Sequence, residues 1–171
     1  MSIVKTSEKR RDVKVVVLGD SGAGKTALLR RFIENLFDDE NPSTIGIDFQ
    51  HKTYILDDNT AVRLQIWDTA GQEKFRHLAP SYIREASVAV IVFDSTDANA
   101  SESIRRWYHY VQTWKSCEIH VVLVASKCDK ATKRTIPPEG LELMKFGGIY
   151  IETSAKTGDN IETVGFFVNN D

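Results

Sequence analysis

The 171-residue sequence is poor in several features, and each shortage argues against a class of protein. Its 2 cysteines, Cys117 and Cys128, have neither a metal-binding nor a redox spacing, so we expect reduced thiols and no disulfide framework. No apolar run reaches the length of a transmembrane helix, and the polar residues 1–12 are unlike a secretory signal. A formal net charge of −2 is not the basic excess typical of nucleic-acid-binding proteins. We therefore expect a cytoplasmic protein with no nucleic-acid partner.

What the sequence does contain is an alternation of apolar runs and helix-period segments, which predicts an α/β domain with a mostly parallel sheet. The turn cluster 57–60 predicts an antiparallel hairpin at one edge of this sheet. We expect a flexible N-terminal arm over residues 1–12 and a single domain over residues 13–171. The expected strands are 13–18, 49–56, 61–67, 88–93, 120–125 and 149–152.

Two of the expected helices contain residues that bear on where the helix begins or on how stable it is. The segment 97–103 supplies capping residues for a helix over 104–114. The last helix is expected to begin near Asn160 and to be cut short at Asp171. Gly165 in its middle should weaken it by roughly 1 kcal/mol relative to alanine.

The most informative segment is the glycine-rich loop 19–26, which follows an apolar strand and leads into a helix. Small residues let backbone N–H groups point at phosphate oxygens, and the start of the helix adds its positive dipole end. Lys25 would place an ammonium between the β- and γ-phosphates, and the Thr26 hydroxyl suits Mg²⁺. The alternative is a purely structural glycine-rich turn. The residues expected to bind phosphate are Ser21, Gly22, Ala23, Gly24, Lys25, Thr26 and Ala27.

A second motif follows the strand 61–67, at the edge of the sheet where ligands of α/β proteins bind. Asp68 is expected to hold the magnesium shell, and Gly71 to offer its N–H to the γ-phosphate. Gln72 is neutral, with both a donor and an acceptor, so it can orient an attacking water without adding charge. Gln72 is thus the candidate catalytic residue.

Four ordered motifs, 19–26, 43–49, 67–73 and 152–156, resemble those of the Ras-superfamily small GTPases. The segments 45–49, 64–67, and 75–76 together with 80–84 are similar to the Rab branch, and the last of them to its Golgi-trafficking members. The resemblance implies a P-loop NTPase G domain, with a six-stranded mostly parallel sheet, one antiparallel edge strand and five helices. It also implies a slow, monomeric GTPase that binds GTP, GDP and Mg²⁺ and regulates vesicle trafficking.

The resemblance also assigns roles to single residues. Thr44 would ligate Mg²⁺ and bond the γ-phosphate, so that loss of this phosphate releases the loop around it. Phe37 would pack on the guanine base, although a buried anchor for the loop is an alternative. Three aromatic side chains match the set that Rab effectors contact, and a further group matches the base-binding positions. The first set is Phe49, Trp67 and Tyr82, and the second is Ser126, Lys127, Asp129, Ser154, Ala155 and Lys156.

Two departures from the family pattern stand out. Ser126 occupies the position of an asparagine and is too short to span both the base edge and the phosphate loop, so we expect weaker binding and faster GDP release. Asp129 keeps the carboxylate that selects guanine. The residues 167–171 hold no cysteine, so we expect membrane attachment only if a prenylated tail exists beyond this chain.

The expected partners are a nucleotide exchange factor, a GTPase-activating protein and effectors, which would bind the segments 44–49 and 71–84. The activating protein should supply an arginine, because none is evident in the site. One alternative is a guanine-nucleotide-binding interaction module with little turnover, possibly one domain of a longer chain. A nucleotide kinase is another, but the sequence lacks an arginine-rich lid.

Overall fold

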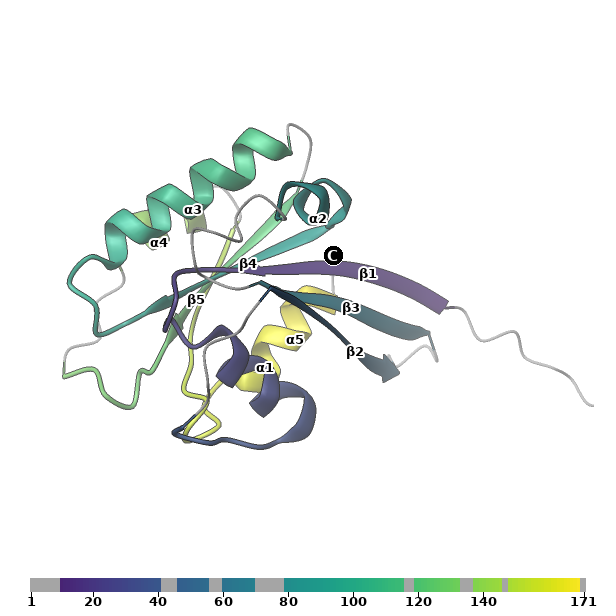
Figure 1. Cartoon of the computed structure of the whole chain (residues 1–171), viewed down its shortest axis with the longest axis horizontal. Helices are drawn as coiled ribbons and strands as arrows, with labels where there is room; N and C mark the ends of the chain where they lie inside the picture. The colour runs from purple at the N-terminus through teal and green to yellow at the C-terminus, as the bar shows by residue number, and fades with distance from the viewer. Residues whose placement is uncertain are drawn as a thin grey trace, which may run out of the picture.

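The computed structural model of the chain describes residues 10–40, 46–55, 60–69, 79–115, 119–132, 137–145 and 148–169. Within these ranges it forms six strands and five helices (Figure 1). The expected α/β class and six-stranded sheet are therefore confirmed. In chain order the elements are β1 (Arg10–Leu18), α1 (Lys25–Glu34), β2 (Ile47–Ile55), β3 (Ala61–Thr69), α2 (Ala79–Glu85), β4 (Val88–Asp94), α3 (Ala100–Trp114), β5 (His120–Ser126), α4 (Pro138–Lys145), β6 (Ile149–Glu152) and α5 (Ile161–Asn169).

The strands lie in the order β2-β3-β1-β4-β5-β6. β2 pairs with β3 in antiparallel fashion, as the turn cluster predicts, and every other pair is parallel. The carboxyl ends of β1, β3, β4 and β5 therefore meet at one edge of the sheet, where open α/β sheets bind ligands.

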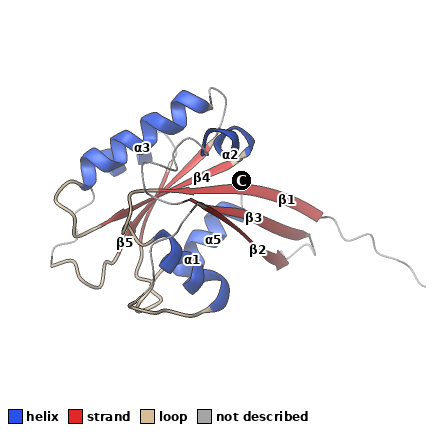
Figure 2. Ribbon diagram, viewed as in Figure 1, coloured by secondary structure: helices blue, strands red, loops and turns tan. Residues whose placement is uncertain are grey.

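Helices cover both faces of the sheet, as Figure 2 shows for α1 and α5 on one side and α2 and α3 on the other. The alternation of side chains along each strand divides the core into two clusters. In β1, Val15 and Val17 face α1 and α5, whereas Val16 and Leu18 face α2 and α3. This double burial explains the continuous apolar run of the strand.

β1 begins at Arg10, earlier than the apolar pattern predicts. Residues 10–12 pair with residues 61–63 of β3, so they belong to the sheet and not to an N-terminal arm. All three are exposed. The expected boundary was wrong because backbone pairing extends beyond the buried part of the strand, and only the buried part has an apolar pattern.

α3 also begins earlier than expected, at Ala100, so part of the predicted capping segment forms its first turn. The N-cap residue is Asn99, whose side chain makes no capping bond. Asp97 instead accepts the backbone N–H of Asn99 at 2.9 Å and orders the approach to the helix. None of the described helices, of which α3 with 15 residues is the longest, is long and apolar enough to span a bilayer.

Gly165 lies where α5 crosses α1 and β2. A Cβ at this position would stand 2.6 Å from Cζ of Phe32 and 2.7 Å from Oη of Tyr54, closer than carbon atoms approach. The expectation that this glycine only weakens the helix was therefore incomplete. Its absent side chain lets the helices approach each other, which a propensity scale does not include.

Candidate functional site

The loop between β1 and α1 lies at the carboxyl edge of the sheet, as the sequence predicts. Gly24 is the N-cap of α1, with φ of 93°, a left-handed conformation that glycine adopts without strain. No side chain in the described part of the chain caps this helix end. The N–H groups of the first helical turn, which have no acceptor within a helix, are therefore oriented toward whatever the loop binds.

Beside this loop is a cavity of about 300 Å³, large enough for a substantial part of a nucleotide. It brings together residues of the loop, of the segment after α1, and of the turns after β5 and β6. Its predicted members are Ser21, Gly22, Gly24, Lys25, Thr26, Ala27, Phe37, Ser126, Lys127, Asp129, Ala155 and Lys156.

Some predicted residues lie elsewhere. Ala23 is in the loop, but its side chain packs in the core. Ser154 is fully buried behind the cavity wall and supports a neighbour. Thr44, Gly71 and Gln72 lie outside the described residues, so their roles stay predictions.

Lys25 is buried, with 5% of its surface exposed. Its Nζ donates to the carbonyl oxygens of Gly19 at 2.9 Å and of Asp20 at 2.8 Å. Burial lowers the pKa of Lys25 to about 8, although the charges of Asp68 and Asp20 oppose this shift. The side chain therefore remains mostly an ammonium at neutral pH, suited to bind an anionic phosphate in the cavity.

Thr26 and Asp68 meet from α1 and β3: the Thr26 hydroxyl donates to Asp68 Oδ2 at 2.6 Å. Asp68 has no exposed surface, and its Oδ1 finds no hydrogen-bond partner among the residues that the structure describes. Burial raises the pKa of Asp68, with the Thr26 bond and the Lys25 charge acting against it. A buried carboxylate with an unsatisfied oxygen beside a hydroxyl is a donor set that fits Mg²⁺.

The opposite end of the cavity is held together by polar bonds between distant segments. Lys127 donates to the Gly22 carbonyl and to Asp94, both at 2.7 Å, and thereby ties the turn after β5 to the phosphate loop. Ser154 donates to Asp129 Oδ1 at 2.6 Å. This bond holds the Asp129 carboxylate at the cavity wall, ready to accept N–H groups of a ligand.

Ser126 reaches the phosphate loop from the end of β5. Its hydroxyl lies 2.5 Å from the carbonyl oxygen of Ala23 and 3.0 Å from that of Phe93. One hydroxyl carries one proton, so it can donate fully to only one of these carbonyls. Ser126 is therefore close enough to brace the loop, but its single donor is already engaged with the main chain.

Phe37 is half-buried and lines the cavity, so it is not a core anchor. The sequence did not predict that the residues after Phe37 would line the cavity. One of them, Asp39, forms a 3.8 Å ion pair with Lys156 across the cavity mouth. Their position next to Phe37 was the available signal. The lining residues that were not predicted are Leu28, Asp38, Asp39, Lys130 and Thr153.

A row of three aromatic rings lies on the edge of the sheet next to the site. The ring centroids of Phe49 and Trp67 are 5.9 Å apart, and those of Trp67 and Tyr82 are 5.5 Å apart. Half of the Phe49 surface is exposed. β2, β3 and α2 thus bring three aromatic rings that are distant in sequence into contact in one row.

The comparison with known proteins agrees with this geometry. The family model described as the Ras family matches residues 14–169, which include every described element of the cavity. With its phosphate loop, its six-stranded sheet and this match over nearly the whole sequence, the chain belongs to the Ras family of small GTP-binding switch proteins.

Proposed function

We propose that this protein is a Rab-type switch, which hydrolyses GTP to GDP with Mg²⁺ and regulates vesicle trafficking in the cytoplasm at endomembrane surfaces. The observation that carries the Rab assignment is the row formed by Phe49, Trp67 and Tyr82. An aromatic cluster that is partly exposed, with half of the Phe49 surface open to solvent, is suited to a partner that must distinguish two nucleotide states.

Different described residues would bind different parts of the nucleotide. Lys25 and the first turn of α1 meet the phosphates, and Asp129 accepts N–H groups of guanine. Thr26 and Asp68 would hold Mg²⁺, which would neutralise part of the phosphate charge. Phe37 would cover the base, and the carboxylate of Asp129 would disfavour adenine.

Hydrolysis would depend on Gln72, which we propose orients the attacking water, and on Thr44 and Gly71, which would contact the γ-phosphate. No arginine is among the described residues that line the cavity. Charge that develops on the γ-phosphate is then poorly neutralised by the chain alone. We therefore propose a slow intrinsic rate, and a GTPase-activating protein that supplies an arginine.

The Rab assignment can be tested by replacing Phe49 with alanine. Partners retained from a membrane extract by protein bound to a non-hydrolysable GTP analogue should bind about tenfold less strongly to the variant, because an exposed aromatic anchor is lost. Ile55→Ala is a matched control, since Ile55 is exposed on the same strand but lies outside the row. Equal loss in both variants, or no loss in either, would contradict the assignment.

The alternative is a binding module that hardly turns over, which the serine at position 126 favours. Single-turnover GTP hydrolysis separates the two functions. For a switch, Gln72→Leu should lower the hydrolysis rate by about tenfold or more, because the water loses its orienting group. A rate equal to that of the wild type would favour the inert module.

A separate prediction concerns the effect of residue 126 on the rate of GDP release. Ser126→Asn should slow GDP release by about two- to twelve-fold, the equivalent of one added net hydrogen bond. An asparagine has donors for the loop and an acceptor for the base edge, whereas the serine donor is engaged with the main chain. Release of fluorescent GDP measures the effect, and identical rates would reject it.

A further inference from the structure

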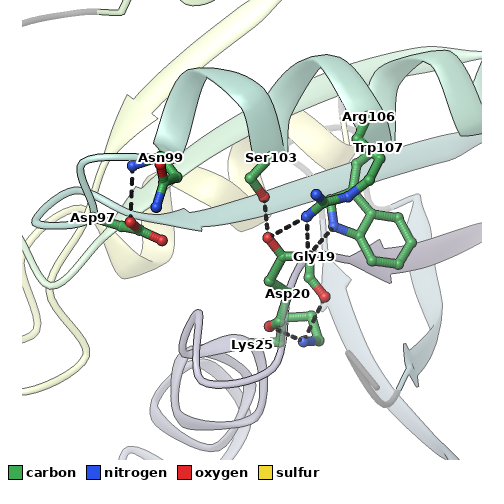
Figure 3. Close-up of polar contacts among 8 residues, drawn as sticks. All are labelled: Gly19, Asp20, Lys25, Asp97, Asn99, Ser103, Arg106 and Trp107. Atoms are coloured by element: carbon green, nitrogen blue, oxygen red, sulfur yellow. Dashed lines mark hydrogen bonds and ion pairs between the residues drawn. The ribbon is translucent and has the colours of Figure 1, made fainter. Parts of the chain in front are cut away.

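The carboxylate of Asp20 connects the phosphate loop to α3 (Figure 3). It accepts the hydroxyl of Ser103 at 2.5 Å and the indole N–H of Trp107 at 3.0 Å. One guanidinium nitrogen of Arg106 lies 2.7 Å from each of its two oxygens. Asp20 has no part in the proposed binding or hydrolysis, yet it accepts hydrogen bonds from three side chains of a helix more than 80 positions away in the sequence.

The backbone around Asp20 also positions Lys25. The carbonyls of Gly19 and Asp20 accept the Lys25 ammonium, and the Asp20 carbonyl accepts the N–H of Ala23 at 3.2 Å. The Asp20 side chain thus anchors to α3 the stretch of main chain that orients Lys25. Figure 3 shows the carboxylate directed toward α3 and the carbonyls toward Lys25.

The negative charge of Asp20 lies in the phosphate loop and is paired with the Arg106 guanidinium. Burial acts to raise the pKa of this carboxyl, but the bonds from Ser103, Trp107 and Arg106 outweigh it and hold the pKa below its ordinary value. The group is therefore an anion within a loop that binds phosphate anions. Arg106 neutralises it, and without Arg106 the carboxylate would repel the phosphates.

We propose that Asp20 is a positioning residue, through which Ser103, Arg106 and Trp107 of α3 hold the phosphate loop in its nucleotide-binding form. Arg106 has the second task of cancelling the charge that the Asp20 carboxylate brings to the phosphate loop. α3, which lies on the opposite face of the sheet from α1, thereby sets the rate at which guanine nucleotide leaves. This inference rests on the binding of guanine nucleotide by the phosphate loop.

The test measures dissociation of fluorescent GDP from the wild-type chain and from its Arg106→Gln and Arg105→Gln variants. Arg106→Gln should release GDP about five- to tenfold faster, because a bond to a charged group is lost and a bare carboxylate remains. Arg105→Gln is a matched control, since this neighbouring arginine pairs with Glu139 of α4 at 2.8 Å and not with the loop. Its release rate should stay within about twofold of wild type.

A second comparison separates the effect of the unpaired Asp20 charge on GDP release from the effect of lost packing. In the double variant Asp20→Asn/Arg106→Gln both charges are absent, so release should be slower than in Arg106→Gln alone. A loop that had only lost packing would gain nothing from the second substitution. Unchanged release in Arg106→Gln, or equal changes in Arg106→Gln and Arg105→Gln, overturns the proposal. So does a double variant that folds and releases GDP as fast as the single one.

Guanine-nucleotide binding and the role of Asp20 are tested by different results. A wild-type chain that takes up no labelled GDP would overturn both guanine-nucleotide binding and the role of Asp20. Normal uptake with no effect of Arg106→Gln would overturn only the role of Asp20. If the double variant does not fold, the comparison of Arg106→Gln with Arg105→Gln decides, because neither arginine is a core residue: 42% of the Arg106 side-chain surface and 71% of that of Arg105 are exposed.

Discussion

Replacing Lys25 by alanine is expected to lower the affinity for GDP by about 100-fold, a loss of about 2.7 kcal/mol of binding free energy. The ammonium is buried at the base of the phosphate loop and already oriented by the Gly19 and Asp20 carbonyls. Hydrogen bonds between charged groups in such a partly desolvated site are among the strongest in proteins. Titration calorimetry with nucleotide-free protein and Mg²⁺ gives the affinity directly.

Lys14→Ala is the control for this loss. Lys14 lies on β1 and pairs with Glu85 at 2.9 Å, in an exposed position away from the cavity. Its removal takes away the same formal charge, so any effect of net charge alone appears in both variants. An affinity of Lys25→Ala within threefold of the control would mean that the phosphates do not bind where we place them.

Gly165→Ala is expected to lower the free energy of unfolding by about 2 kcal/mol, although alanine is the better helix former. The new Cβ would lie within 2.7 Å of Phe32 and Tyr54 atoms. Neither ring can move away easily. Phe32 is buried, with Nζ of Lys52 4.0 Å from its ring centroid, and the Tyr54 hydroxyl donates to Glu162 at 3.2 Å. Overpacking costs of about 1–3 kcal/mol exceed the helix-propensity gain of about 1 kcal/mol.

Urea unfolding followed by circular dichroism measures this change. Thr163→Ala introduces the same side chain on the same helix, where propensity favours it, and should be neutral or slightly stabilising. The sign of the difference between the two variants is decisive. A more stable Gly165→Ala would show that α5 lies farther from Phe32 than the structure has it.

The cavity could be predicted largely from sequence because most of its parts are local. Gly24, Lys25 and Thr26 are adjacent, and a strand, a glycine loop and a helix in this order place backbone N–H groups and an ammonium together. Asp68, which lies next to Thr26, could be predicted because it ends an apolar run and strands of a parallel sheet end at one edge. In the structure it is the second-last residue of β3, which is two residues longer than the run predicts. Its bond to Thr26 agrees with that reasoning.

The boundaries of the elements were less predictable. Arg10 to Asp12 pair with β3 through their backbone, and backbone pairing leaves no trace in side-chain polarity. The contact of Ser126 with the phosphate loop was unpredictable for a related reason, since the distance from β5 to the Ala23 carbonyl depends on how two strands and a loop pack. The expected failure of the same side chain to reach the base edge as well stays a prediction.

The sequence by itself determined the alternation of strands and helices, the phosphate loop and the order of the nucleotide-binding motifs, because each is encoded by residues close together in the chain. Only the tertiary structure decided the contacts between distant segments. Among them are the anchoring of Asp20 by α3, the close approach of Gly165 to Phe32 and the joining of Phe49, Trp67 and Tyr82 in one surface. The physical reason is that such contacts depend on the relative placement of whole elements, which the packing of the two core layers sets and no local pattern records.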